Sequence, residues 1–424
     1  MTTQRDSKIL TQVGPGTPLG ELMRRYWLPA ALSSEIEPDG PPIRTVLLGE
    51  KLIVWRDTSG RLGVMDHRCP HRCASFYFGR NEDDGIRCTY HGWKFDVDGN
   101  CTDMANVPPH QDFKEKVKAK AYKAEERNGL IWIYMGPKRK MPALPDVEAS
   151  LFPEDEIDEY RFVMRECNWL QALEGDIDTS HLSFLHFGGV EQSDWIEADS
   201  NNYVLANRAP EYLVEDTDFG VTYAAHRPVE NGEVSWRVAH FLFPCWALPP
   251  ISTLDRNVLA RAWVPMDDEH TMFISVGKKG SIDAFPIQSP VAMGKLAGLS
   301  LIDNVIPNGT GWYERFRLEE NEANDYNIDW AVQKHLSYTG IEGIHVQDQQ
   351  ASESMGAITD HSFEHLAPSD IMVTRTRRRI VRAANALKKN GTAPPGADDP
   401  RVFKVRGGSF TAPEGVNGLE VYRD

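Results

Sequence analysis

The chain has 424 residues, which suggests two or three domains of about 150 residues each. Its 46 basic and 62 acidic residues give a net charge of −16, which argues against nucleic acid as a partner, since phosphate binding needs a basic face. The chain opens with the polar segment MTTQRDSKIL, and its apolar runs are shorter than the roughly 20 residues of a membrane span. We therefore expect an ordered cytoplasmic protein that binds neither membranes nor nucleic acid.

The first part of the chain is predicted to contain a short helix. Thr17 suits the cap and Pro18 the first helical position, and apolar residues follow at helical spacing from residue 19 to 26. We expect residues 1–43 to form a helical segment that packs on the C-terminal domain.

From residue 44 the pattern changes to short strands separated by turns. The runs RTVLLG, KLIVWRD and RLGVMD come first, and the apolar run from Gly129 to Tyr134 comes last. The segment GPKRKMPALPD then reads as a linker and places a domain boundary near residue 137. Residues 44–137 are therefore predicted to form a small all-β domain.

Strand-like and helical patterns are mixed in residues 138–424. The strand-like blocks lie near residue 221, at 234–243 and at 259–276. Helical patterns occupy 168–186 and the region after Asn324. The mixture predicts a larger α+β domain.

A basic amphipathic helix is predicted to begin after Ser369 and Asp370. Five arginines lie between Arg375 and Arg382, and apolar residues share one face of the helix. Such a helix can bind membranes or partners. Packing on its own domain, with a solvated basic face, is the more common outcome and is our expectation.

Two short motifs pair a cysteine with a histidine. Cys69-Pro-His71 is followed, after sixteen residues, by Cys88-Thr-Tyr-His91. Two thiolates and two imidazoles on facing loops can hold the two irons of a [2Fe–2S] cluster. A zinc site accepts the same ligands, but its usual spacing puts two cysteines in one half and two histidines in the other. We predict the cluster, and assign the remaining cysteines to packing: Cys73, Cys101, Cys167 and Cys245.

A second candidate metal site lies in residues 168–186, a helix-compatible segment. Asp178 and His181 are three residues apart and would share a helical face. His181 and His186 are five apart, which implies an irregularity in the helix or at its end. Two imidazoles with a distant carboxylate would form the 2-His-1-carboxylate site of non-heme Fe(II) oxygenases. The histidine pair alone is weak evidence of a site, but an upstream cluster needs an electron acceptor.

The chain resembles the α subunit of Rieske oxygenases, and more narrowly the phthalate 4,5-dioxygenase group. The matching segments are PLGELMRRYWLPAALSSE, CPHR, CTYHGWKFDVDGN, NWLQALEGDIDTSHLSFLH, NDYNIDWAVQKHLSYTGIEGIHVQDQQASESM and EHLAPSD. The resemblance implies an all-β Rieske domain followed by a catalytic α+β domain, whose antiparallel sheet is covered by helices. It also implies one [2Fe–2S] cluster and one mononuclear Fe(II) per chain.

The same resemblance implies a ligand set for the mononuclear iron. His181 and His186 match the histidine ligands, and Asp348 matches the carboxylate ligand. Asp360 and Asp325 are alternatives for the carboxylate. We prefer Asp348 because the pair Gln347-Asp348 sits in the matching motif.

Asp178 matches the family's bridging carboxylate, to which the resemblance gives a catalytic role. It would link an iron-binding histidine to a cluster-binding histidine of a neighbouring subunit, either His71 or His91, and we favour His91. Members without a β subunit form head-to-tail α3 trimers, sometimes stacked as α3α3 hexamers. Glu174 stands where some relatives carry an amide near iron, so its role is open.

The resemblance favours aromatic acids as substrates, such as phthalate, substituted benzoates and methoxylated acids derived from lignin. Dihydroxylation, monohydroxylation and demethylation are all open to dioxygen chemistry of this kind, because the pocket and not the ligand set chooses among them. A carboxylate substrate needs a cation, for which Arg237 in SWRVAHFLFP is the first candidate and Arg208 a weaker one. An ordinary cross-strand ion pair is the alternative for Arg237.

No G-x-G-x-x-G nucleotide motif and no all-cysteine cluster motif occur in the chain. A separate flavin and iron–sulfur reductase is therefore expected to supply the electrons. The alternative function is an iron–sulfur electron-transfer protein without oxygenase activity. It is disfavoured because such a carrier needs neither the large second domain nor the histidine pair.

Overall fold

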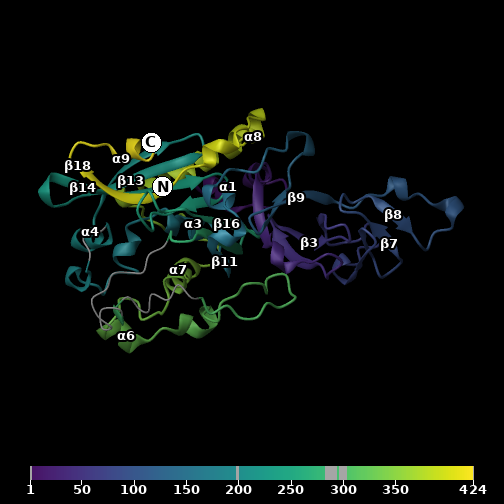
Figure 1. The fold of residues 1–424 in the computed structure, drawn as a ribbon, viewed down its shortest axis with the longest axis horizontal. Helices are drawn as coiled ribbons and strands as arrows, with labels where there is room; N and C mark the ends of the chain where they lie inside the picture. Colours follow the sequence, from purple (N-terminus) through teal and green to yellow (C-terminus); the bar gives the residue numbers. More distant parts are fainter. Residues whose placement is uncertain (1, 197–199, 282–293, 296–302, 424) are drawn as a thin grey trace.

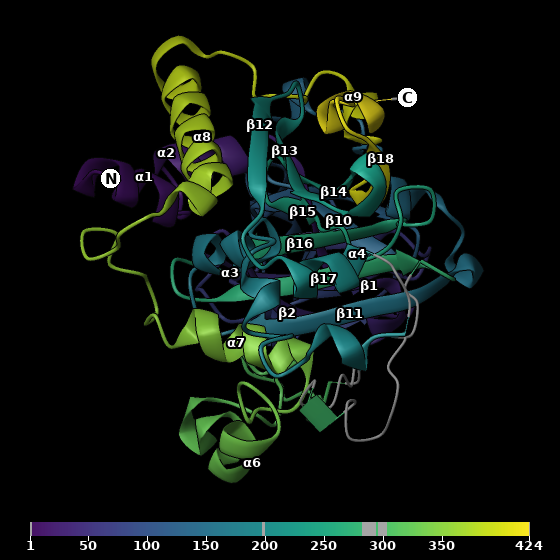
Figure 2. The ribbon, with the colours of Figure 1, turned by 90° about the vertical axis from the view of Figure 1, so that its left-hand side faces the viewer.

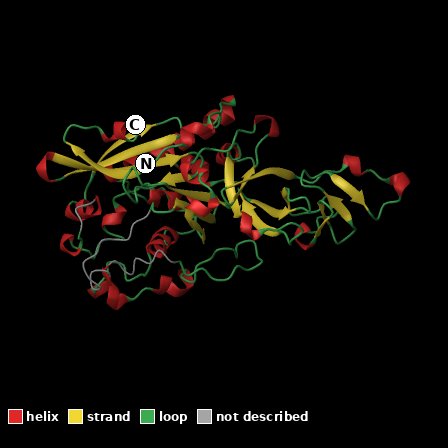
Figure 3. Cartoon of the chain, viewed as in Figure 1, coloured by secondary structure: helices red, strands yellow, loops and turns green. Residues whose placement is uncertain are grey.

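The computed structural model describes residues 2–196, 200–281, 294–295 and 303–423. The chain is elongated and has two parts along its long axis (Figure 1). Short strands make up most of one part, whereas a broad sheet with helices around it makes up the other (Figure 3). This arrangement is the expected one of an all-β domain followed by an α+β domain.

The all-β part contains two sheets. One has six strands in the order β1-β10-β9-β4-β3-β2, and the other has four in the order β5-β6-β7-β8. Their bounds are β1 (Trp27–Leu32), β2 (Ile43–Leu47), β3 (Glu50–Arg56), β4 (Leu62–Asp66), β5 (Arg80–Glu82), β6 (Gly85–Arg87), β7 (Trp93–Phe95), β8 (Cys101–Met104), β9 (Ala121–Arg127) and β10 (Leu130–Tyr134). The smaller sheet carries the second cysteine–histidine motif between β6 and β7.

Two helices precede these sheets. They are α1 (Gln4–Thr11) and α2 (Pro18–Met23), and the Thr17 side chain caps α2 by accepting a hydrogen bond from the Gly20 amide. Both pack against α8 (Ile371–Asn390) of the second part (Figure 2). Residues 27–32 were expected in a helical segment, but they form β1, which pairs with β10.

The α+β part is built on one antiparallel sheet of eight strands. The order is β11-β17-β16-β15-β14-β13-β12, and β18 also pairs with β14. The bounds are β11 (Ile157–Arg165), β12 (Glu211–Asp216), β13 (Gly220–Pro228), β14 (Glu233–Leu242), β15 (Trp246–Leu248), β16 (Leu259–Pro265), β17 (Thr271–Lys278) and β18 (Gly408–Pro413). Every residue of β16 is buried, so this strand lies in the core.

Helices surround this sheet. In the part of the chain that the structure describes, the further α-helices are α3 (Trp169–Asp176), α4 (Ser200–Ala206), α6 (Trp330–His335), α7 (Ile344–Glu353) and α9 (Gly418–Val421). Helix α3 packs on β15 and β16 and also contacts α7. The two segments that carry the predicted iron ligands are thereby brought together.

The predicted basic helix is α8, and it packs against β12 and β13 of its own domain. Its basic face is only partly solvated. Arg377 is 5% exposed and forms ion pairs with Glu174 of α3 and with Glu364. Within the described residues, no helix is long and apolar enough to cross a membrane.

Candidate metal centres and substrate pocket

The four residues of the first motif pair come together at one end of the molecule. Cys69 and Cys88 are 1% and 3% exposed, and each starts a tight turn in which its carbonyl accepts an amide hydrogen bond four residues on. The His71 and His91 rings lie beside each other, with centroids 4.4 Å apart. The two turns therefore present two sulfurs and two imidazoles to one site.

The surroundings of these donors suit a bound metal group. Burial, with the Cys88 sulfur beside it, raises the pKa of the Cys69 thiol to about 12. A thiolate in such a place requires a cation next to it. Trp93 stacks on the His71 ring at 4.3 Å and fixes its plane. The mixed donor set fits a [2Fe–2S] cluster with two cysteine and two histidine ligands.

Of the cysteines assigned to packing, Cys101, Cys167 and Cys245 are buried but Cys73 is exposed. Cys73 adopts a left-handed conformation, with φ of 61°, and its amide closes the turn onto the Cys69 carbonyl. The assignment of Cys73 to packing is therefore wrong, because the turn leaves its thiol exposed.

The expected helix over residues 168–186 is wrong beyond Asp176, where α3 ends. Asp178 consequently lies in the turn that follows α3, and His181 begins a short 3-10 helix (His181–Ser183), so the two residues do not share one α-helical face. The Asp178 carboxylate accepts hydrogen bonds from the amide and hydroxyl of Ser180, at 2.8 and 2.6 Å. Such local side-chain bonds compete with helical ones, which explains the early end of α3.

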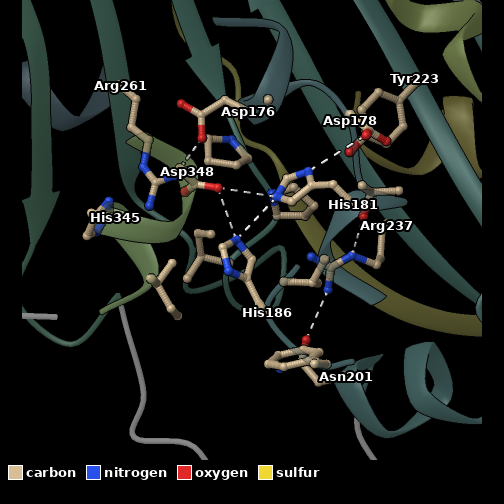
Figure 4. Close-up of a pocket in the computed structure, with 18 residues that line it drawn as sticks. Asp176, Asp178, His181, His186, Asn201, Tyr223, Arg237, Arg261, His345 and Asp348 are labelled. Carbon is tan, nitrogen blue, oxygen red and sulfur yellow. Dashed lines mark hydrogen bonds and ion pairs between the residues drawn. The ribbon is translucent and has the colours of Figure 1, made fainter. Parts of the chain in front are cut away.

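His181, His186 and Asp348 converge in space (Figure 4). The Nε2 atoms of the two histidines are 3.3 Å apart, and Asp348 Oδ1 lies 3.2 Å from that of His186 and 3.8 Å from that of His181. The alternatives Asp360 and Asp325 are exposed and outside this cluster. Two imidazoles and one carboxylate are a donor set typical of non-heme iron.

The electrostatics of this cluster favour a cation. Burial alone would raise the pKa of Asp348, but the His186 and His181 imidazoles outweigh burial and hold that pKa well below its usual range. Burial likewise disfavours the protonated form of His186, yet Asp348 raises its pKa. A metal cation that takes the place of these protons would satisfy all three side chains.

Each histidine has an outer neighbour at its second ring nitrogen. His186 Nδ1 lies 2.8 Å from Oε1 of Gln347, whose amide donates to the Ile341 carbonyl at 2.9 Å. His181 Nδ1 is buried without a hydrogen-bond partner among the described residues, and Asp178 Oδ2 lies 3.8 Å away. Gln347 was missed as a functional residue, although its place beside Asp348 pointed to it.

A pocket opens beside these three residues (Figure 4). Its apolar lining includes Leu182, Phe187, Pro249, Ile251 and Ile344. Arg237 of β14 lines it too and is 4% exposed. Its guanidinium donates to Thr179 Oγ1 at 2.9 Å and to Asn201 Oδ1 at 3.3 Å. The pocket therefore combines an apolar lining with the buried guanidinium of Arg237.

Arg208 and Glu174, whose roles the sequence left open, do not line the pocket. Arg208 donates to backbone carbonyls between residues 183 and 190, so it braces the segment that follows His181. Glu174 pairs with Arg377 of α8 and does not line the pocket. Six polar lining residues were not anticipated: Asp176, Thr179, Asn201, Tyr223, Arg261 and His345.

Two family models match successive parts of the chain. The Rieske [2Fe-2S] domain family matches residues 26–118, and the family described as LigXa C-terminal domain like matches residues 133–413. A crystal structure of dicamba monooxygenase bound to dicamba shares the fold, with a TM-score of 0.55 and 18% identity over 86% of this chain and 98% of that one.

Curated relatives align over nearly the whole chain. The 3-chlorobenzoate-3,4-dioxygenase oxygenase subunit of Comamonas testosteroni is 46% identical, with 100% of this chain and 98% of that protein covered. The phthalate 4,5-dioxygenase oxygenase subunit of Pseudomonas putida is 38% identical, with 93% and 88% covered. The 5,5'-dehydrodivanillate O-demethylase oxygenase subunit of a Sphingobium strain is 39% identical, with 96% and 86% covered. The chain thus belongs to the Rieske oxygenase α subunits, in the group that includes phthalate 4,5-dioxygenase.

Proposed function

We propose that this protein is the terminal oxygenase component of a cytoplasmic multicomponent enzyme that hydroxylates an aromatic carboxylate with dioxygen. A separate NAD(P)H-dependent flavin and iron–sulfur reductase would supply its electrons. The observation that carries the proposal is the convergence of His181, His186 and Asp348 beside a pocket that contains a buried arginine. A bare electron carrier needs no such pocket.

The chain's own residues would hold both metal groups. Cys69, His71, Cys88 and His91 would ligate the [2Fe–2S] cluster. His181, His186 and Asp348 would ligate a mononuclear Fe(II). When bound, the cluster supplies single electrons and the iron, with its open positions, activates dioxygen.

The neighbours of the iron ligands would orient them. Gln347 accepts a hydrogen bond from His186 Nδ1 and so presents Nε2 to the metal site. Asp178 would orient His181 in the same way. The distance between Asp178 Oδ2 and His181 Nδ1, which is 3.8 Å, would need to shorten only a little for a hydrogen bond to form.

The substrate would lie on the apolar wall of the pocket, with its carboxylate toward Arg237. A guanidinium gives two parallel donors to a carboxylate, and burial strengthens that interaction. Three relatives named above act, by their names, on chlorobenzoate, phthalate and dehydrodivanillate. Each of these compounds is an aromatic acid, which supports this substrate class.

An α3 trimer would bring the two metal groups within reach of each other. The cluster motifs lie in the all-β part and the iron residues in the α+β part, along an elongated chain (Figure 1). Head-to-tail packing would place the cluster of one subunit beside the iron of the next. Asp178 would then connect His181 to His91 of the partner subunit, and two stacked trimers would give a hexamer.

The test is dioxygen and NADH consumption by the purified protein with a suitable reductase and a panel of aromatic acids. We expect consumption that depends on the acid, and a hydroxylated or demethylated product. The His181→Ala variant should lose this activity and keep its cluster absorbance, whereas His335→Ala on exposed α6 should keep both. NADH oxidation without an oxygenated product for any acid would support the electron-transfer alternative.

A further inference from the structure

An arm of the α+β part, residues 303–320, extends toward the all-β part (Figure 1). Hydrogen bonds join its two limbs: the Ile306 amide donates to the Arg317 carbonyl at 2.9 Å, and the Gly309 amide donates to the Glu314 carbonyl at 2.9 Å. These bonds give the arm a hairpin-like shape, although neither limb is a regular strand of a sheet.

The arm is rooted on the α+β part. The Tyr313 ring stacks on the His270 ring with centroids 4.2 Å apart, and the Tyr313 hydroxyl donates to Asp267 Oδ2 at 2.6 Å. The Met164 amide of β11 donates to the Phe316 carbonyl at 2.8 Å. The arm therefore has a fixed position relative to the catalytic sheet.

The tip of the arm contacts the all-β part. The Trp312 ring meets the His67 ring edge to face, with centroids 4.9 Å apart. The Arg44 guanidinium of β2 lies over the Tyr77 ring at 3.7 Å and over the Trp312 ring at 5.2 Å, and it donates a hydrogen bond to the Thr310 carbonyl. Trp312 thus joins one domain, whereas its neighbour in the sequence is held by the other.

These contacts lie at the neck of the loop that carries the first cysteine–histidine motif. His67 stands two residues before Cys69, and the Phe76 amide closes the loop by donating to the His67 carbonyl at 2.6 Å. The His67 Nδ1 atom also lies 3.2 Å from Ser75 Oγ. Because Tyr77 follows directly, the ring contacts of the arm reach both sides of this neck.

We propose that Trp312 and Arg44 are positioning residues for the [2Fe–2S] cluster, and that the arm holds the first motif's loop in the conformation that ligates it. A cluster held by two separate loops requires both loops to be ordered, so a contact that orders one loop contributes to cluster retention. Retention would then depend on the α+β part as well as on the domain that supplies the ligands. This inference goes beyond the proposed function and involves neither the iron site nor a substrate.

The experiment measures how fast the full-length, cluster-loaded protein loses its cluster to EDTA, followed as bleaching of the visible absorbance well below the unfolding temperature. Trp312→Ala should lose the cluster about tenfold faster, because an edge-to-face ring pair and a cation–π pair together typically contribute about that factor. Trp312→Phe keeps an aromatic ring beside His67 and should recover most of the wild-type rate. The matched control is Trp330→Ala, because the Trp330 side chain is 68% exposed on α6.

Low urea concentrations separate positioning of the loop from general stability. Opening of one loop exposes little surface, so the faster loss in Trp312→Ala should hardly change with urea. Global unfolding exposes much more surface, so loss that proceeds through it would rise steeply with urea.

A Trp312→Ala protein that loses its cluster at the rate of the control would overturn the inference. Loss that rises steeply with urea would also overturn it, and so would a Trp312→Phe protein as fast as Trp312→Ala. If Trp312→Ala does not fold with a cluster, Arg44→Met decides in the same assay: it removes the cation over both rings, and an unchanged or strongly urea-dependent rate would overturn the inference.

Discussion

Replacing Gln347 by alanine should weaken iron binding without touching an iron ligand. Gln347 is 1% exposed, and its Oε1 lies 2.8 Å from Nδ1 of His186, which is itself 4% exposed. The variant would leave the buried His186 N–H without an acceptor, at a cost of about 1–3 kcal/mol. That cost corresponds to a loss of roughly ten- to a hundredfold in metal affinity, the range typical of such outer partners.

The assay is competition for Fe(II) between the protein and a chelator under anaerobic conditions. The intact cluster absorbance serves as an internal check of folding. Gln350→Ala is the matched control, because Gln350 lies on the same helix and its side chain makes no hydrogen bond to the part of the chain that the structure describes. A Gln347→Ala protein with the affinity of the control would refute the assigned role of Gln347.

Three further changes test other parts of the site. Asp178→Asn should retain cluster and iron but slow electron transfer between them by orders of magnitude, seen as a persistent reduced-cluster spectrum after rapid mixing with substrate and dioxygen; reoxidation at the wild-type rate would exclude the bridging role. Arg237→Ala should raise KM for a carboxylate substrate about ten- to a hundredfold, and much less for its neutral amide. Arg377→Met should destabilise the protein by about 3 kcal/mol in thermal unfolding, since it leaves the partly buried Glu174 and Glu364 without their buried cation; an unchanged Tm would show that the ion pairs are dispensable.

Local motifs were enough to nominate most of the candidate metal-binding residues, because these residues are separated by short, regular spacings in the sequence. The cysteine–histidine pairs and the His181–His186 pair each lie within one segment. Asp348 lies far along the chain, and only a resemblance to known oxygenases selected it over other aspartates. Asp348 is brought to the two histidines by the packing of α7 on α3, and a contact between such distant segments cannot be inferred from a local sequence pattern.

The sequence patterns failed where a side-chain hydrogen bond, or pairing with a distant strand, outweighs the local preference for a helix. The helix over 168–186 was predicted too long because the Asp178 carboxylate bonds the Ser180 amide and hydroxyl in place of helical bonds. Strand β1 was missed because it contains Pro29, which an edge strand tolerates, and because its partner β10 lies about a hundred residues away. The Asp176–Arg261 pair joins a helix to a strand of the sheet, so it appears only in three dimensions.

The central claim is that this protein inserts oxygen from dioxygen into an aromatic acid. The most direct measurement is a single turnover of the reduced protein with ¹⁸O₂ and an aromatic acid that it binds, followed by mass spectrometry of the product. We predict ¹⁸O in the product at an amount that matches the reoxidised cluster. Cluster reoxidation without a labelled product for any bound acid would contradict the claim.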